Sequence, residues 1–371
     1  MLSQLLQKRS LLPILTLNSG ASATKDTWPL RRREMLSALE TWSYGKTPAA
    51  PSRVCGQIES EDADAFGGKL LFQRIRISFE TERGVFSFPI FLHIPRRTEK
   101  PPVFLHLEFR YGLPEHEAPL RYVPLEEIMD SGYALASVCY TDIVNDNHFG
   151  DFTGGLAAFF GTTADRAPDE WGKIGMWAYA ASRVLDYLLT REDLDALHTA
   201  VVGHSRLGKT ALWAGAQDER FFMVISNNSG YGGAATSKGG SGERVTDFIN
   251  VGSWDWYCSN FQLFTGEKED AKPYDQAYLL ALIAPRYLCV GSAQEDAGAD
   301  PESEFLTSLW ASQAWPLLGK NGLVTPDRMP APGDMLNDGC VSYHLRAGGH
   351  FFSREDWLAY IRFFDRKLGR R

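Results

Sequence analysis

Two unrelated chemistries fit one segment of the chain, Gly203-His204-Ser205-Arg206-Leu207-Gly208-Lys209-Thr210. As G-x-x-x-x-G-K-[ST], it matches a loop whose backbone and lysine bind phosphate groups, with Thr210 available for Mg²⁺. As a sharp turn between a strand and a helix, it exposes the Ser205 hydroxyl as a nucleophile, with one extra residue before the second glycine. The first interpretation predicts a nucleotide-binding protein, and the second predicts a serine hydrolase.

The rest of the chain favours the serine hydrolase. A phosphate-binding loop normally opens its sheet, whereas at least three predicted strands precede this one. The next predicted strand, 222–226, runs into Asn227 and Asn228 instead of an acid that would hold Mg²⁺. Acidic residues follow the predicted strand 287–291, and His350 precedes the last helix. The order Ser, acid, His is that of the α/β hydrolases, so we interpret the phosphate-loop match as chance.

The residue types explain the chemistry. A serine hydroxyl is a weak nucleophile until an imidazole accepts its proton, and that imidazole needs an acid to fix its tautomer. We therefore predict Ser205 as the nucleophile and His350 as the base, and the backbone amide of Arg206 as a donor to the oxyanion. The candidates for the acid are Glu295, Asp296 and Asp300. The second oxyanion donor is expected from the segment with His106, Glu108 and Arg110.

The elements that must position these residues follow from hydrophobic periodicity. Short apolar strands alternate with helices after Pro101-Pro102, which predicts a mostly parallel central sheet with helices on both faces, the α/β-hydrolase fold. The predicted strands are 103–109, 133–140, 199–202, 222–226 and 287–291; the predicted helices are 169–190, 207–217, 302–318 and 354–368. Before them, 69–80 and 86–95 alternate as a hairpin does, and 25–45 has helical spacing. We expect residues 1–50 to form a helical extension packed on a catalytic domain, 51–371.

Composition narrows the class of protein. The 371 residues include 46 acidic and 38 basic ones, a net charge of −8, which argues against a nucleic-acid partner recognised through net charge. The chain contains no apolar run near the ~20 residues of a membrane span, so no membrane partner is expected. Its five cysteines are scattered, and its histidines and carboxylates lack metal-ligand spacing, so we expect no disulfide framework, metal or other cofactor. Residues 8–23 resemble a secretion signal weakly; we expect a cytoplasmic location, with secretion as the alternative.

The chain resembles a known family. Segment 203–209 is similar to the G-C-S-R-x-G-K elbow of the glucuronoyl esterases, carbohydrate esterase family 15. Further matches follow in order along nearly the whole chain, and they are specific as a set. They include Trp28 with Arg31-Arg32-Arg33, Tyr44-Gly45-Lys46-Thr47-Pro48, Glu170-Trp171-Gly172, Ser229-Gly230-x-Gly232-Gly233, Trp256-Tyr257-Cys258-x-Asn260-Phe261 and Tyr343-His344-x-Arg346-x-Gly348-Gly349-His350.

The resemblance implies hydrolysis of an ester on the carboxyl of glucuronic acid, as in the link between 4-O-methylglucuronoxylan and lignin alcohols. It implies that Ser205 is the nucleophile, that His350 is the base and that the Arg206 side chain assists the oxyanion. The acid would be Asp296, which matches the acid of some relatives. Residues that bind the sugar hydroxyls would be Lys209 and Glu243. The expected partner is a small-molecule or oligosaccharide uronate ester, and the oligomeric state is left open.

The chain also departs from the family. Asn228 stands where many members have the acid, and Gly298 stands where they have a tryptophan that stacks on the sugar. His204 replaces the cysteine before the nucleophile. Trp254 and Trp256 are candidates for sugar contact, although a core position for Trp254 fits the sequence equally well. The alternatives are therefore an acetyl esterase acting on xylan or an oligosaccharide, another small-ester hydrolase, or a catalytically silent carbohydrate-binding homologue.

Overall fold

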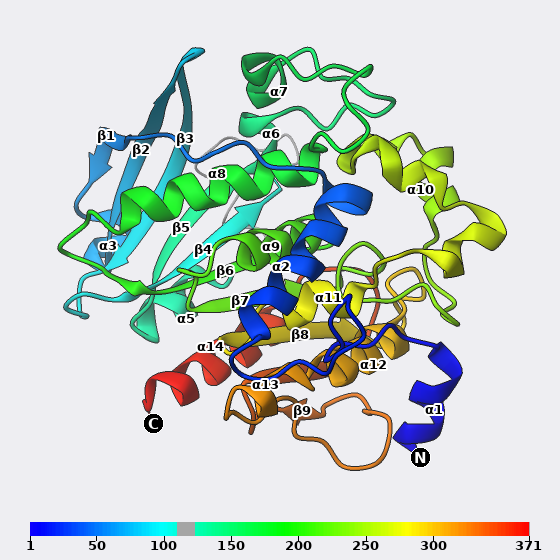
Figure 1. Cartoon of the computed structure of the whole chain (residues 1–371). Coiled ribbons are helices and arrows are strands. Elements are labelled where there is room, and N and C mark those ends of the chain that lie inside the picture. The colour runs from blue at the N-terminus through cyan, green and yellow to red at the C-terminus, as the bar shows by residue number, and fades with distance from the viewer. Residues whose placement is uncertain (110–122, 371) are drawn as a thin grey trace.

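The computed structural model describes residues 1–109 and 123–370, and within them ten strands form a single sheet. The strand order is β1-β2-β3-β5-β4-β6-β7-β8-β10-β9 (Figure 1). The strands are β1 Val54–Asp62, β2 Leu70–Thr81, β3 Gly84–Pro95, β4 Pro102–Glu108, β5 Ala134–Cys139, β6 Asp195–His204, β7 Met223–Asn227, β8 Tyr287–Ala293, β9 Met335–Leu336 and β10 Val341–Arg346. All pairs from β5 across to β10 are parallel, whereas β1, β2, β3 and β9 pair antiparallel. The mostly parallel sheet predicted from the sequence is confirmed.

Helices connect the parallel strands and cover both faces of the sheet. In the described residues they are α1 Leu2–Arg9, α2 Trp28–Leu39, α3 Ala65–Gly68, α5 Leu125–Asp130, α6 Tyr140–Ile143, α7 Gly155–Phe160, α8 Lys173–Leu188, α9 Arg206–Gln217, α10 Val245–Asn250, α11 Gln276–Ala281, α12 Pro301–Ala311, α13 Ala314–Leu317 and α14 Arg354–Leu368. Shorter π and 3₁₀ turns are η1 Glu40–Tyr44, η2 Ser253–Trp256, η3 Ser259–Leu263 and η4 Gly266–Ala271. Figure 1 shows α8, α9 and α2 crossing in front of the sheet.

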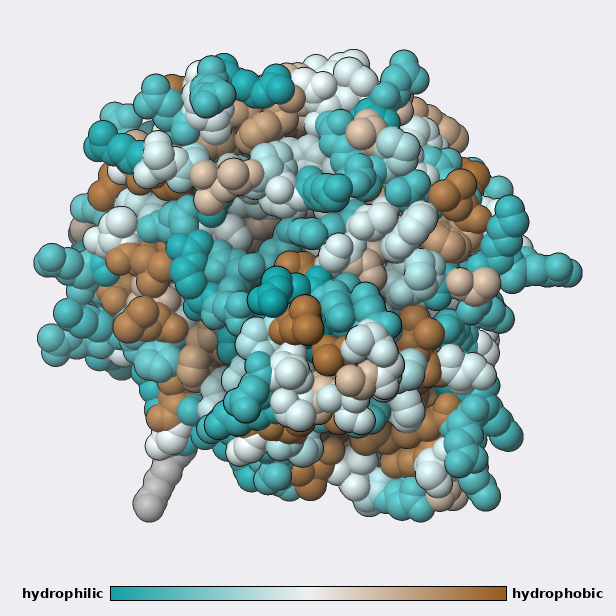
Figure 2. All heavy atoms as spheres, in the orientation of Figure 1, coloured by the Kyte–Doolittle hydropathy of each residue, from teal (hydrophilic) through white to brown (hydrophobic). Residues whose placement is uncertain are grey.

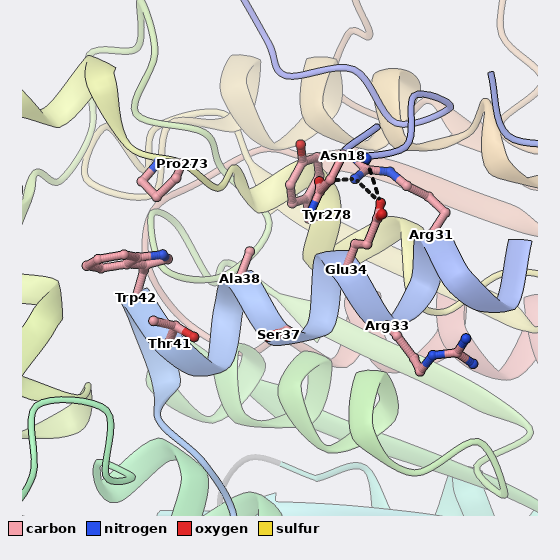
Figure 3. Close-up of a pocket in the computed structure, with 10 residues that line it drawn as sticks. All are labelled: Asn18, Arg31, Arg33, Glu34, Ser37, Ala38, Thr41, Trp42, Pro273 and Tyr278. Carbon is pink, nitrogen blue, oxygen red and sulfur yellow. Dashed lines mark hydrogen bonds and ion pairs between the residues drawn. The ribbon is translucent and has the colours of Figure 1, made fainter. Parts of the chain in front are cut away.

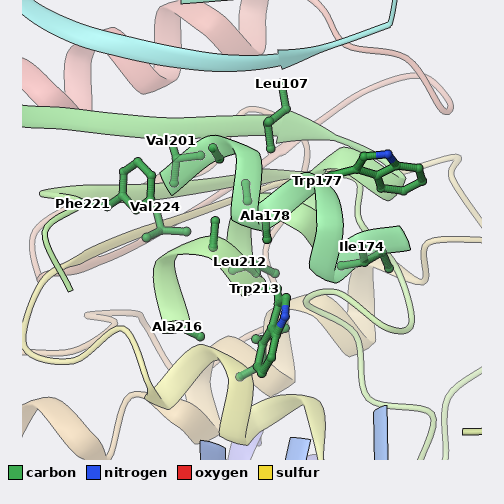
Figure 4. Packing of buried hydrophobic residues seen from close by; sticks show 14 of the residues in the cluster. Leu107, Ile174, Trp177, Ala178, Val201, Leu212, Trp213, Ala216, Phe221 and Val224 are labelled. Carbon is green, nitrogen blue, oxygen red and sulfur yellow. The ribbon is translucent and has the colours of Figure 1, made fainter. Parts of the chain in front are cut away.

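The alternation of side chains along each strand divides the core between the two faces. Leu105, Val201 and Val224 face a large buried cluster that also holds residues of α8, α9 and α11. Figure 4 shows this packing, with Leu107, Val201 and Val224 on one side of α9 and Trp213 on the other. Phe104, Val202 and Ile225, each one residue away, belong to a second cluster with residues of α5 and α14. Both faces are therefore buried, which explains why these strands are apolar throughout.

The N-terminal residues pack into the larger of these clusters. Ile14, Trp28, Met35 and Tyr44 belong to the same buried cluster as the helices α8 and α9.

The face of the molecule in Figure 2 is mainly hydrophilic, with hydrophobic residues in small separate patches. None of the helices in the described residues has both the length and the apolar character that crossing a membrane requires.

Several boundaries differ from the sequence-based predictions for physical reasons. The predicted helix 302–318 is two helices, because Pro316 lacks an amide hydrogen and its ring excludes a regular turn around Ser312. Strand β1 was not predicted; most of its residues are exposed, so it lacks an alternating apolar pattern. The short helix α1 was not predicted either, and it is held by tertiary contacts such as Arg9 Nη1 to Ser303 Oγ at 2.9 Å.

Candidate active site

A strained turn joins β6 to α9 and exposes Ser205. β6 ends at His204 and α9 begins at Arg206, so Ser205 alone makes the turn, with φ 56° and ψ −128°. The turn requires glycine at position 203, because a Cβ there would lie 2.1 Å from the carbonyl oxygen of Leu207. A non-glycine residue at positive φ is strained, and such strain is concentrated at functional sites. The structure therefore contains the strand-to-helix turn that the sequence predicts.

Three loops at one edge of the sheet bring the predicted relay together. Ser205 follows β6, Asp296 follows β8 and His350 follows β10, and the carboxyl ends of these parallel strands meet at the same edge. His350 Nε2 lies 2.9 Å from Ser205 Oγ, and His350 Nδ1 lies 2.6 Å from Asp296 Oδ2. With its Nδ1 proton donated to the carboxylate, the imidazole presents Nε2 as the acceptor for the serine proton.

Asp296 is the candidate acid that reaches His350. Its side chain is 6% exposed, whereas Glu295 is exposed. Asp300 instead caps α12, accepting hydrogen bonds from the amide and the hydroxyl of Ser303 at 3.0 and 2.7 Å. Burial raises the pKa of Asp296, but hydrogen bonds from His350 and Asn228 outweigh burial and hold that pKa below its usual value. Asp296 is therefore ionised at neutral pH and able to stabilise an imidazolium.

Asn228, which follows β7, contacts the same carboxylate. Its Nδ2 donates to Asp296 Oδ2 at 2.7 Å, and its backbone is left-handed with φ 45°. Asparagine tolerates this conformation better than most residues. Asp296 Oδ2 thus accepts from both His350 and Asn228, so the amide helps to orient the acid.

His204 lies beside the relay without joining it. Its Nδ1 lies 2.7 Å from Asn227 Oδ1, and its ring centroid lies 4.6 Å from that of His350. Burial and the neighbouring His350 lower the pKa of His204 to about 4. The side chain is therefore neutral at pH 7 where it packs against His350.

The oxyanion would form next to Arg206. The Arg206 amide is the first of α9, where backbone N–H groups have no partner within the helix and the helix dipole favours negative charge. Its guanidinium forms an ion pair with Asp146 and lies 4.5 Å above the Trp256 ring. His106 and Glu108 are buried on β4, and Arg110 lies outside the described residues.

A cavity of about 170 Å³ opens beside the nucleophile. It is lined by Ser205, Lys209, Asn228, Ser229, Gly230, Glu243, Asp296, Gly298, Ala299 and His350. This volume is comparable to the ~150 Å³ of a protein cavity that holds one benzene ring. On one wall, Lys209 Nζ lies 3.1 Å from Glu243 Oε2 and donates to the carbonyls of Ser229 and Tyr231, both at 2.7 Å. The lysine is 3% exposed and the glutamate 40%, so the pair presents a polar, hydrogen-bonding wall.

The two predicted tryptophan contacts lie elsewhere. Trp254 packs against Gly150 and lies 6.0 Å from the guanidinium of Arg166. Trp256 is 6% exposed and lies under Arg206. Neither is among the described residues that line the cavity. A Cβ placed at Gly298 would have one described atom within 4 Å, Asp296 Oδ1 at 3.9 Å, so the described part of that wall is open.

The sequence did not indicate a role for one carboxylate near the site, that of Glu304. Glu304 of α12 is fully buried, and its Oε1 accepts from the amides of Ser229 and Gly230 at 2.9 and 3.0 Å. Its Oε2 accepts from Ser292 Oγ at 2.5 Å. Burial raises the pKa of Glu304 to about 7. In sequence it looks like an ordinary acid in the first turn of a helix, which carries no signal of this role.

A second cavity, of about 530 Å³, lies away from the relay against α2 (Figure 3). Its polar side chains pair with one another, with Arg31 Nη1 3.2 Å from Glu34 Oε2 and 3.5 Å from Asn18 Oδ1. Trp42 lies at its other end in Figure 3. Within residues 1–109 and 123–370, no group of three or more His, Cys, Asp or Glu side chains is placed to hold a metal ion.

Comparisons with known proteins identify the family of the chain. The family model described as "Glucuronyl esterase, fungi" matches residues 128–319. The structure of a glucuronoyl esterase from Solibacter usitatus is 34% identical, covers 96% of this chain and 97% of that one, and superposes with a TM-score of 0.87. A carbohydrate esterase from an unknown prokaryotic organism is 33% identical over 96% of this chain and 89% of its own length. The 4-O-methyl-glucuronoyl methylesterase of Schizophyllum commune is 25% identical over 74% of this chain and 64% of its own. The chain therefore belongs to the glucuronoyl esterases of carbohydrate esterase family 15, and it is a carboxylic ester hydrolase with the α/β-hydrolase fold.

Proposed function

We propose that this protein cleaves alkyl or aryl esters of glucuronic acid, or of its 4-O-methyl derivative, through an acyl-enzyme on Ser205. The observation that carries the proposal is the relay from Ser205 through His350 to Asp296, which opens on a cavity with the Lys209–Glu243 pair in its wall. The name of the Schizophyllum commune relative, a methylesterase of 4-O-methyl-glucuronoyl groups, supports this substrate class.

The geometry supplies each step. Ser205 Oγ attacks the ester carbonyl while His350 Nε2 takes its proton, and Asp296 stabilises the imidazolium. The carbonyl oxygen becomes an oxyanion that the Arg206 amide and guanidinium stabilise. His350 then returns the proton to the leaving alkoxide, so the alcohol departs and the glucuronoyl group stays on Ser205. Water, deprotonated by His350, attacks the acyl-enzyme and releases the free uronic acid and Ser205.

The size and the polar groups of the cavity determine which part of the substrate it can hold. Its volume of about 170 Å³ suits one sugar ring and not several. Sugar hydroxyls both donate and accept hydrogen bonds, and the Glu243 carboxylate, which is 40% exposed, can accept from them. The three N–H groups of Lys209 already donate to Ser229, Tyr231 and Glu243, so the lysine holds this carboxylate in the wall. The uronate ring would therefore occupy the cavity, and the alcohol would leave toward solvent.

A second candidate follows from the open wall at Gly298. Among the described residues, no aromatic side chain lines the cavity, so that part of the lining offers a sugar ring no stacking surface. Smaller acyl groups therefore lose little binding free energy relative to a uronate. This favours acetyl esters of xylan or oligosaccharides, or other small esters, as the alternative substrates.

A substrate panel separates the two. Benzyl glucuronate and an acetylated xylo-oligosaccharide are incubated with the protein, with Ser205→Ala and with Ser87→Ala, an exposed serine on β3 that serves as the matched control. Release of benzyl alcohol with little acetate supports the glucuronoyl esterase, and the reverse supports the acetyl esterase. Ser205→Ala should lower turnover by about 10³-fold or more while Ser87→Ala leaves it unchanged. Full activity in Ser205→Ala would overturn the proposal.

A further inference from the structure

The Arg206 side chain, next to the nucleophile, is held on several sides. Its Nη1 forms the ion pair with Asp146, and its guanidinium lies 4.5 Å above the Trp256 ring and 5.8 Å from the Phe109 ring. The side chain is 28% exposed, whereas the Asp146 side chain is 8% exposed. Arginine has a long side chain that loses rotamer freedom when it is fixed in one conformation. These contacts remove that freedom before any substrate arrives.

Asp146 is the centre of this arrangement. Its Oδ1 accepts from Trp256 Nε1 at 2.7 Å, and its Oδ2 accepts from Tyr140 Oη at 3.2 Å as well as from the guanidinium. One carboxylate therefore fixes both the charged group and the aromatic ring on which it lies. A carboxylate that accepts three hydrogen bonds in a nearly buried position is set in one orientation.

The loop that carries Asp146 is itself anchored by a buried ion pair. Lys173 Nζ and Asp255 Oδ2 lie 2.8 Å apart with both side chains fully buried. On either side of this pair, Lys173 donates to the carbonyl of Asn147 at 2.5 Å and the Gly150 amide donates to Asp255 at 3.1 Å. The backbone next to Asp146 is thus tied to α8 and η2, which fixes the position of the Asp146 carboxylate.

The guanidinium keeps donors available after these contacts are made. The contact with Asp146 uses Nη1, and the buried Nε of Arg206 has no hydrogen-bond partner among the described residues. An arginine carries five N–H donors and this side chain is 28% exposed, so donors other than the buried Nε and the one facing Asp146 can point at an anionic oxygen beside Ser205. The geometry points to Asp146 as a positioning residue that holds the Arg206 guanidinium for the oxyanion. This inference rests on the proposed ester hydrolysis.

A double-mutant cycle tests the inference. Asp146→Asn keeps an acceptor for Trp256 Nε1 but removes the charge that holds Arg206, so kcat should fall about 10- to 100-fold, with KM changed less than threefold. Arg206→Ala should lower kcat at least as much. If Asp146 acts through Arg206, the double variant should be no slower than Arg206→Ala alone, within about twofold. Losses that multiply in the double variant would overturn the inference.

Controls keep the outcome interpretable. Asp165→Asn removes an exposed carboxylate from the same connection between β5 and α8 and should leave kcat unchanged. If Asp146→Asn does not fold, as thermal melting would show, Asp146→Glu and Trp256→Phe replace it in the cycle. Activity that survives Ser205→Ala would reject the proposed function itself. A dead Ser205→Ala together with a wild-type kcat in Asp146→Asn would reject only the role of Asp146.

Discussion

His350 donates to an acid that follows β8, with its Nδ1 2.6 Å from Oδ2 of Asp296. The residue that follows β7, Asn228, donates to the same oxygen at 2.7 Å. Two adjacent strands thus meet at one carboxylate, where one strand supplies the charge and the other supplies a neutral donor. The relay keeps an ionised acid although the position after β7 carries an amide.

The first prediction concerns the identity of the acid. Asp296→Asn should lower kcat by about 10³- to 10⁴-fold, because an amide neither fixes the required imidazole tautomer nor stabilises the imidazolium. Glu295→Gln, which changes an exposed neighbour, should stay within about twofold of the wild type. Steady-state release of benzyl alcohol measures both variants. Equal losses in the two would show that Asp296 is not the acid.

The second prediction concerns Asn228. Asn228→Asp replaces a donor to Asp296 with a second carboxylate beside it, and two such carboxylates resist ionising together. Burial raises the pKa of Asp296, and the bonds from His350 and Asn228 now hold that pKa low, so losing one donor and gaining a like charge must raise it. The acidic limb of the kcat/KM profile should therefore move to higher pH than in the wild type. An unchanged acidic limb would contradict the orienting role of Asn228.

The sequence could predict the parts of the site that depend on local geometry. The glycine at 203 and the serine at 205 belong to one turn whose backbone admits few residue types. Burial of the central strands on both faces is equally local, because it follows from their apolar runs. The family resemblance added the choice of Asp296, which the residues alone left open against Glu295 and Asp300.

Other features depend on contacts between distant segments and leave no pattern in the sequence. Glu304 looks like a helix-capping acid, yet it is buried against Ser229 and Ser292, which lie on other elements. Trp256 belongs to a segment that matches the family and Trp254 lies just before it, but the direction of each side chain depends on distant contacts, with Gly150 for Trp254 and with Asp146 for Trp256. Edge strand β1 is mostly exposed and therefore lacks the alternation on which prediction depends.

The third prediction concerns recognition of the sugar. Glu243→Gln should raise KM for benzyl glucuronate about 10-fold, because a hydrogen bond between a carboxylate and a sugar hydroxyl contributes about 1.5–3 kcal/mol. Lys209 keeps its bonds to two backbone carbonyls, so the fold should be preserved. Hydrolysis of p-nitrophenyl acetate, which has no sugar ring, should change less than twofold. Glu267→Gln, at an exposed site in η4, is the matched control. An equal effect on both substrates would assign Glu243 a structural role.

The last prediction concerns stability and pH through Glu304. Burial raises the pKa of this carboxyl to about 7, against hydrogen bonds from Ser292 and Gly230 that favour its charged form. Between pH 4.5 and 7 the folded protein therefore binds a proton that the unfolded chain has released. By linkage, this group makes the free energy of unfolding fall as pH rises through that range, and its stabilisation is fully lost above pH 7.

Glu304→Gln removes this titration while keeping the contacts. The amide oxygen accepts from Ser229 and Gly230, and the amide nitrogen donates to Ser292 Oγ. The variant's Tm minus that of the wild type should therefore increase from pH 5 to pH 8, by several degrees in thermal melts. Glu355→Gln, at an exposed position in α14, should show a difference that does not change with pH. If the Tm difference for Glu304→Gln is equally independent of pH, the prediction is wrong. The buried carboxyl would then have the same pKa in the folded and the unfolded protein.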